Sequence, residues 1–125
     1  MPRIALALVA TAAALVAVPA VGDSAPERAV KTEVVRVGDD FYAPSELRVK
    51  SGTKVKWKWI DVNLNTHNVV LTDKHPKGVK RKDFKSSNGA IGIRFARRLE
   101  KAGNYGFICT FHRTTMKLEI EVRKN

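Results

Sequence analysis

Apolar and polar residues alternate along several short stretches of the chain. The clearest case is residues 54–59, where Val55, Trp57 and Trp59 take one parity and three lysines take the other. A period of two indicates a strand with one face in a hydrophobic core and the other in water. We interpret the two tryptophans as core residues that contact no substrate.

Shorter patterns of the same kind recur along the chain and are separated by turn signals such as Gly38-Asp39-Asp40 and Ser51-Gly52. Residues 72–90 lack such a pattern, and we expect a long loop there with one helical turn at most. The chain has no internal repeat and no long amphipathic helix. Seven or eight short strands with turns at close intervals predict an all-β fold, a Greek-key β-sandwich. The remaining strands are expected at residues 31–37, 47–49, 69–71, 91–96, 105–109 and 117–123.

The N-terminal residues have a different character. A short basic start is followed by an almost unbroken apolar run over residues 4–18, and a small-residue cleavage site follows at Ala20. These features are typical of a secretory signal peptide. We therefore expect an exported protein, periplasmic or extracellular. Cleavage nearer residue 24 or 25 is one alternative, and an uncleaved membrane anchor is another.

The remaining length fits one folded domain. We divide the chain into a signal peptide over residues 1–20, a polar linker over 21–30 and a single domain over 31–125.

Cys109 is the only cysteine of the chain. An internal disulfide is therefore excluded, as is a binuclear copper centre with two bridging thiolates. In an oxidising compartment a lone thiol pairs between chains, stays buried as a small apolar residue, or binds a metal.

Metal binding is favoured by the neighbours of Cys109. His112 and Met116 follow within eight residues, Met116 is the only methionine besides Met1, and His67 opens an expected strand far upstream. Two imidazoles, a thiolate and a weak axial thioether are the ligand set of a blue-copper electron-transfer site. We therefore predict one mononuclear type 1 copper site with these four ligands. His75 has no sulfur neighbour in the sequence and is left out.

Three segments carry a resemblance to a known family. Residues 41–59 resemble the N-terminal half of the cupredoxins, the plastocyanin and amicyanin group. The motifs HNVV at His67 and GNYGFICTFH at residues 103–112 are similar to the family's two ligand segments, and the likeness covers residues 33–123. Three residues separate His112 from Met116, whereas bacterial relatives usually have two and plastocyanins four. The sequence MKLEIEV still resembles the family's last strand and supports Met116 as the axial ligand.

The resemblance implies roles for the residues around the ligands. The Asn68 amide would donate to the Cys109 sulfur, and Thr110 would pair with the Asn68 side chain. The ring edge of His112 would reach the surface and serve as the port for electrons. Arg113, which stands where relatives commonly carry proline, flanks this port together with Phe111, and we take both as candidate partner-docking residues.

The formal net charge of the chain is +11, and removal of residues 1–20 takes away only Arg3 and leaves +10. A chain this basic seeks an acidic partner protein, anionic lipid headgroups or nucleic acid. Export argues against nucleic acid. The run of basic residues within 74–85 is either a solvated face or a docking surface.

These observations predict a small exported blue-copper protein that carries single electrons between redox partners. We expect a monomer that docks on an acidic redox protein, with association at a membrane surface as a further option. Two alternatives remain open: a copper-homeostasis or delivery protein without a redox partner, and a metal-free β-sandwich that binds an acidic surface. We do not expect an enzyme, because three histidines are too few for a second copper and no Ser/His/Asp or paired-carboxylate arrangement stands out in the sequence.

Overall fold

A computed structural model describes residues 13–14 and 30–125. The predicted signal peptide and linker therefore lie almost entirely outside the described residues. The described part forms eight strands and one short 3-10 helix. Their bounds are β1 (Thr32–Gly38), β2 (Phe41–Ala43), β3 (Glu46–Lys50), β4 (Thr53–Trp59), β5 (Val70–Leu71), η1 (Arg81–Asp83), β6 (Arg94–Leu99), β7 (Gly103–Ile108) and β8 (Lys117–Arg123).

The strands form two four-stranded sheets, with the orders β2-β1-β4-β6 and β3-β8-β7-β5. Two pairs are parallel, β1 with β4 and β3 with β8, and the other pairs are antiparallel. The all-β Greek-key sandwich predicted from the sequence is confirmed. None of the helices in the described part of the chain is long and apolar enough to cross a membrane.

The core lies between the two sheets. β4 follows its sequence pattern strictly, because every second residue from Thr53 to Trp59 is buried and the lysines between them are exposed. The Trp57 ring lies 5.1 Å from the Phe95 ring in its own sheet and 5.0 Å from the Phe107 ring in the facing sheet. Trp57 therefore joins the two layers, which confirms the tryptophans as core residues.

The strand expected at residues 91–96 was placed too early in the chain. β6 begins at Arg94, and Ile91 is 60% exposed. Gly92 has a φ of 72°, a left-handed conformation that a continuing strand does not use. The apparent alternation before Arg94 therefore belongs to a bend.

Two other differences concern short strands. β2 has only three residues and was not predicted, and β5 has only two. β5 lies within the strand expected at residues 69–71, whereas the three residues of β2 are too few for a period of two to be seen. The single turn of η1 within residues 72–90 agrees with the sequence prediction.

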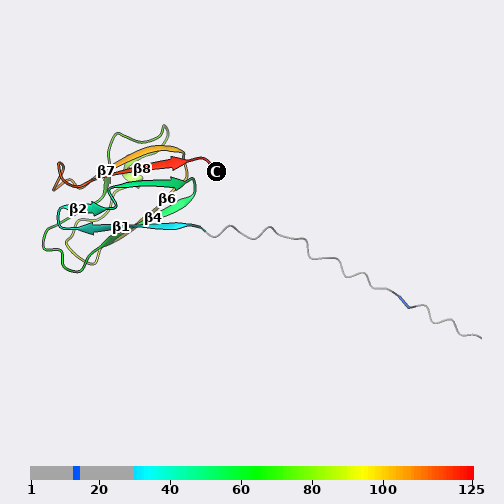
Figure 1. Ribbon diagram of the computed structural model, residues 1–125, viewed down its shortest axis with the longest axis horizontal. Coiled ribbons are helices and arrows are strands. Elements are labelled where there is room, and N and C mark those ends of the chain that lie inside the picture. The colour runs from blue at the N-terminus through cyan, green and yellow to red at the C-terminus, as the bar shows by residue number, and fades with distance from the viewer. Residues whose placement is uncertain (1–12, 15–29) are drawn as a thin grey trace, which may run out of the picture.

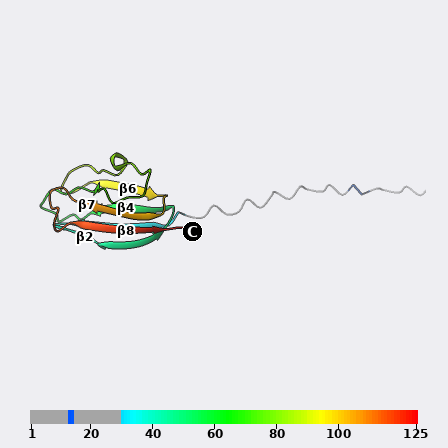
Figure 2. The same cartoon turned by 90° about the horizontal axis from the view of Figure 1, so that it is seen from above.

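The strands run along the length of the domain, so the loops gather at its two ends (Figures 1 and 2). The turn between β1 and β2 and the loop between β7 and β8 lie at the same end, opposite the C-terminus (Figure 1). β4 is parallel to β1, so the loop that follows Trp59 also starts at this end. This end of the sandwich holds the predicted metal ligands.

Candidate metal centre

Three of the predicted ligands, Cys109, His112 and Met116, lie on the loop that joins β7 to β8. Cys109 comes directly after β7 and is fully buried. The His112 amide donates to the Cys109 carbonyl at 3.2 Å, and the Met116 amide donates to the His112 carbonyl at 2.9 Å. The Cys109 amide donates to the Met116 carbonyl at 3.2 Å, which closes the loop on itself. This bonding fixes the spacing of the loop residues before any metal is bound.

His67 comes from a separate segment and is held by its backbone. Its amide donates to the Gly89 carbonyl at 3.0 Å, and the Gly89 amide donates back to the His67 carbonyl at 3.1 Å. The Trp59 indole also donates to the Gly89 carbonyl, at 3.1 Å. The segment that carries His67 is therefore anchored to β4 through Gly89.

The structure brings the three strong donors together. One ligand atom of each of His67, Cys109 and His112 lies within 4.8 Å of the others. The Cys109 sulfur is 3.6 Å from Nδ1 of His112, and the two imidazole centroids are 5.0 Å apart. One thiol and two imidazoles that converge in this way fit a copper ion of the blue type.

The Nδ1 atom of His67 gives an independent test of this fit. It is buried and has no hydrogen-bond partner, although an unpaired buried polar atom is costly. The opposite ring nitrogen, Nε2, lies 2.9 Å from the Asp39 carboxylate. A carboxylate there selects the tautomer with its proton on Nε2 and leaves the Nδ1 lone pair free. Bound copper would satisfy this lone pair.

Met116, the expected axial ligand, is fully buried. It ends the loop and lies directly before β8. The structure therefore places it on the inner side of the loop that carries Cys109 and His112.

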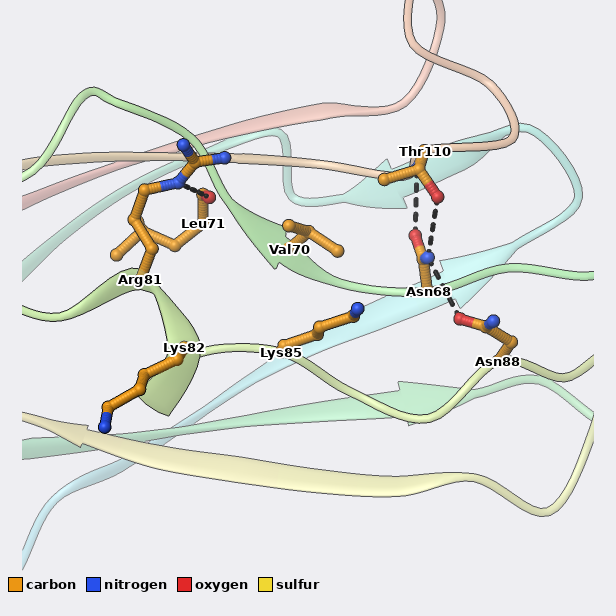
Figure 3. A pocket seen from close by; sticks show the side chains of 8 residues that line it. All are labelled: Asn68, Val70, Leu71, Arg81, Lys82, Lys85, Asn88 and Thr110. Carbon is orange, nitrogen blue, oxygen red and sulfur yellow. Dashed lines mark hydrogen bonds between the residues drawn. The ribbon is translucent and has the colours of Figure 1, made fainter.

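Asn68 and Thr110 lie against each other behind the loop. The Asn68 side chain donates to the Thr110 hydroxyl at 2.8 Å and accepts from the Thr110 amide at 2.8 Å (Figure 3). It also donates to the side chain of Asn88 at 3.0 Å. The resemblance implied a hydrogen bond from the Asn68 amide to the Cys109 sulfur. This bond is not among the hydrogen bonds of the described residues. Asn68 thus joins the His67 segment to the residue after Cys109.

Tyr42 contributes a buried hydroxyl to the same region. It donates to the Asn68 carbonyl. Burial raises the pKa of Tyr42 well above its ordinary value, and the nearby charge of Cys109 raises it further. The phenol therefore stays neutral and acts as a hydrogen-bond donor beside the thiol.

The expected electron port is more enclosed than the sequence suggested. The His112 side chain is 23% exposed, and its Nε2 lies 2.9 Å from Oδ1 of Asp40. Phe111 is 50% exposed, and Arg113 is also exposed. The ring edge of His112 thus reaches the surface beneath a carboxylate.

Sequence reasoning missed Asp39 and Asp40, which it assigned only to a turn. Both carboxylates contact the imidazole of a predicted ligand. No local signal marks them, because these contacts depend on how distant segments meet in the fold.

The model of the copper-binding proteins of the plastocyanin/azurin family matches residues 29–123. The chain belongs to this family. Copper is accordingly the cofactor of this cupredoxin, and the donor cluster of His67, Cys109 and His112 is suited to hold it. No curated protein sequence matches the chain at a significant level.

Solved structures support the same fold. A reduced amicyanin variant is 24% identical, with a TM-score of 0.58, and the match covers 74% of this chain and 82% of that one. An oxidised methionine-to-leucine variant of amicyanin is 25% identical, with a TM-score of 0.58 and coverages of 72% and 80%. The copper-containing nitrite reductase of Thermus scotoductus is 28% identical, with a TM-score of 0.62. That match covers 85% of this cupredoxin but only 25% of the enzyme.

Proposed function

We propose that this cupredoxin is an exported one-electron carrier whose copper is bound by His67, Cys109, His112 and Met116. The observation that carries the proposal is the convergence of one thiol and two imidazoles within 4.8 Å, with a buried Nδ1 that lacks a partner. When bound, copper supplies a one-electron couple between Cu(II) and Cu(I). The soft thiolate favours Cu(I), and imidazole suits both states.

The chain contributes rigidity to electron transfer. Cys109 would release its proton to solvent on binding copper as a thiolate, and its backbone is held by the closed loop. His67 is held by Gly89 at its backbone and by Asp39 at its ring. His67 and Cys109 are fully buried, so water is kept from the two inner donors. Donors that move little between oxidation states keep the reorganisation energy small.

The proposed route for electrons is the edge of the His112 ring, whose side chain is only 23% exposed. Phe111 and Arg113 are exposed beside it and form the proposed docking residues. Arg81, Lys82 and Lys85 line a surface pocket whose other end is formed by Asn68, Asn88 and Thr110 (Figure 3). Thr110 directly follows Cys109, so basic side chains lie beside the ligand loop. This arrangement and the net charge of +11 support an acidic redox protein as the partner.

Addition of one equivalent of Cu(II) to the purified domain tests the site. We expect an intense blue thiolate-to-copper band and narrow copper hyperfine splitting in the electron paramagnetic resonance spectrum. Cys109→Ser should abolish the band, whereas His75→Ala should leave it intact because His75 Nδ1 lies against its own loop at the Pro76 carbonyl. A colourless wild-type complex with ordinary tetragonal copper would refute the proposal.

A further inference from the structure

One two-residue turn contacts both histidines of the candidate site. β1 and β2 pair up to Gly38 and Phe41, so Asp39 and Asp40 alone make the turn between them. Asp39 Oδ1 lies 2.9 Å from Nε2 of His67, and Asp40 Oδ1 lies 2.9 Å from Nε2 of His112. The histidines are 45 positions apart in the chain, yet adjacent carboxylates reach the outer nitrogen of each.

The backbone of the turn makes this divergence possible. Asp40 has a φ of 66°, in the left-handed region. Among residues with a side chain, aspartate and asparagine tolerate this conformation best. The reversal of the chain at Asp40 turns its carboxylate toward the ligand loop, while Asp39 faces the loop that delivers His67.

The two carboxylates have different surroundings. Asp39 also accepts the amides of Leu64 at 2.9 Å and Asn65 at 3.0 Å. It therefore ties down the loop before His67 as well as the ring itself. Among the described residues Asp40 contacts a charged partner only at His112, as an ion pair that is not an aligned hydrogen bond, and its side chain is 51% exposed. Asp40 acts on the imidazole alone.

A carboxylate on the outer N–H of a metal-binding imidazole has a known effect. It fixes the ring orientation and the tautomer, and it makes the inner nitrogen a stronger donor. A stronger donor and an added negative charge favour Cu(II) over Cu(I), and this lowers the reduction potential.

We propose that Asp39 and Asp40 are positioning residues for the copper site, and that Asp40 also sets its reduction potential through His112. The inference rests on the proposed function, because it needs His67 and His112 as ligands. Asp39 preorganises His67, and Asp40 holds the outer ligand while it lowers the potential.

Asp40→Asn is the decisive variant. Asparagine keeps the shape of the side chain and tolerates the left-handed backbone, so the turn is preserved and the charge is lost. Loss of such a partner weakens metal binding by roughly 10- to 100-fold. Each tenfold loss that falls on Cu(II) and spares Cu(I) raises the potential by about 59 mV. Asp61→Asn removes the same charge from an exposed residue and serves as the control.

The measurements are the Cu(II) dissociation constant, the reduction potential and the copper hyperfine splitting. Support consists of a weaker Cu(II) complex and a higher potential for Asp40→Asn than for Asp61→Asn. Equal values for these two variants, with a blue wild-type protein, would overturn the inference and leave the proposed function standing. A wild-type protein without the blue band would overturn both.

Asp39→Asn separates the two positions. It should lower the thermal unfolding midpoint of the metal-free protein, because three donors lose their charged acceptor, whereas Asp40→Asn should leave this midpoint near that of the wild type. If either variant fails to fold, nitrogen NMR of the wild-type Cu(I) protein decides the matter. The Nε2 proton of each histidine should exchange slowly with water, as expected for an N–H group held by a carboxylate, and a freely exchanging Nε2 proton on either ring would contradict the inference.

Discussion

The Asp39 carboxylate is stabilised in its charged form by the groups around it. The amide of Leu64, the ring of His67 and the amide of Asn65 donate to it, and together they hold its pKa at about 2, below the ordinary value of 3.8. A depressed pKa means that the folded state binds this proton less readily than the unfolded state does. The stability that Asp39 contributes is therefore complete above about pH 4 and is lost as the pH falls toward 2.

This linkage can be measured on the metal-free protein. We expect the unfolding free energy of the wild type to exceed that of Asp39→Asn at pH 6, and the difference to shrink steadily between pH 4 and 2. Denaturant titrations at a series of pH values give both quantities. A difference that stays constant over this range would show that the three hydrogen bonds do not favour the carboxylate form.

Asn68 is the residue that joins the two ligand segments. Its side chain is buried and bonds the amide and the hydroxyl of Thr110. In Asn68→Ala the Thr110 amide loses its acceptor, and a group left unpaired in this way costs about 1–3 kcal/mol. We expect a loss of stability of that size, together with broader copper hyperfine lines because the loop after Cys109 is less fixed.

Denaturant unfolding and electron paramagnetic resonance measure the two effects. Asn88→Ala removes only the outer contact and should have a smaller effect on both.

Among the elements, β8 connects the ligand loop to the core. It begins directly after Met116 and pairs with β7 from Lys117 to Val122, and every second residue from Leu118 is buried. Leu118 is 1% exposed, and its truncation to alanine leaves a cavity beneath the loop. Leu118→Ala should lower the unfolding free energy by about 2–5 kcal/mol.

Lys117 is the matched control for that variant. It is the neighbouring residue of β8, its side chain faces solvent, and Lys117→Ala should change the stability by less than about 0.5 kcal/mol. Chemical denaturation of both variants tests the inward and outward assignment of the strand. Equal losses for the two would mean that β8 does not pack as described.

Elements of this kind were predictable from the sequence, whereas the shortest pairings around them were not. β4 and β8 each carry a full alternation over seven residues, because one face of each strand packs in the core. β2 has only three residues and was not predicted, and His67 is positioned by a single bridge to Gly89. Pairing between such distant segments leaves no periodic trace in the sequence.

The residues of the candidate site also fall into predictable and unpredictable ones. The ligand residues could be proposed because few residue types bind copper and three of them crowd one loop. Asp39 and Asp40 could not, because Gly38-Asp39-Asp40 reads as an ordinary turn and the imidazoles that they contact come from two other parts of the chain. Their role becomes visible only in the fold, because the β1–β2 turn, the His67 segment and the β7–β8 loop meet at the same end of the sandwich.

At the scale of the whole molecule, the placement of charge decides how a partner approaches. Positive side chains cover several faces of the domain, and the outer face of β4 alone presents Lys54, Lys56 and Lys58. Only part of this charge lies near the proposed port. Lys82 and Lys85 line the same surface pocket as Thr110, which lies on the ligand loop. Lys54 instead lies near the start of β4, at the end of the sandwich opposite His67.

A pair of charge-reversal variants distinguishes local docking from attraction by net charge. Lys82→Glu/Lys85→Glu and Lys54→Glu/Lys56→Glu change the net charge equally, so any attraction that depends on total charge weakens equally in both. Docking beside the ligand loop predicts that the first pair slows electron transfer to an acidic redox protein roughly tenfold or more at low salt, and that the second pair slows it much less. Stopped-flow recording of the blue band, which appears as the reduced copper protein gives its electron to the partner, measures the rates.

Raising the salt concentration provides the internal check. At 1 M salt the Debye length is about 3 Å, so both variants and the wild type should converge on one slow rate. If the two pairs slow the reaction equally at low salt, the positive charge acts as a general attractor and the loop-side residues have no special part in docking. If the wild-type rate does not depend on salt, the partner binds through the exposed Phe111 and the apolar parts of the port, and the acidic-partner proposal fails while the copper site is unaffected.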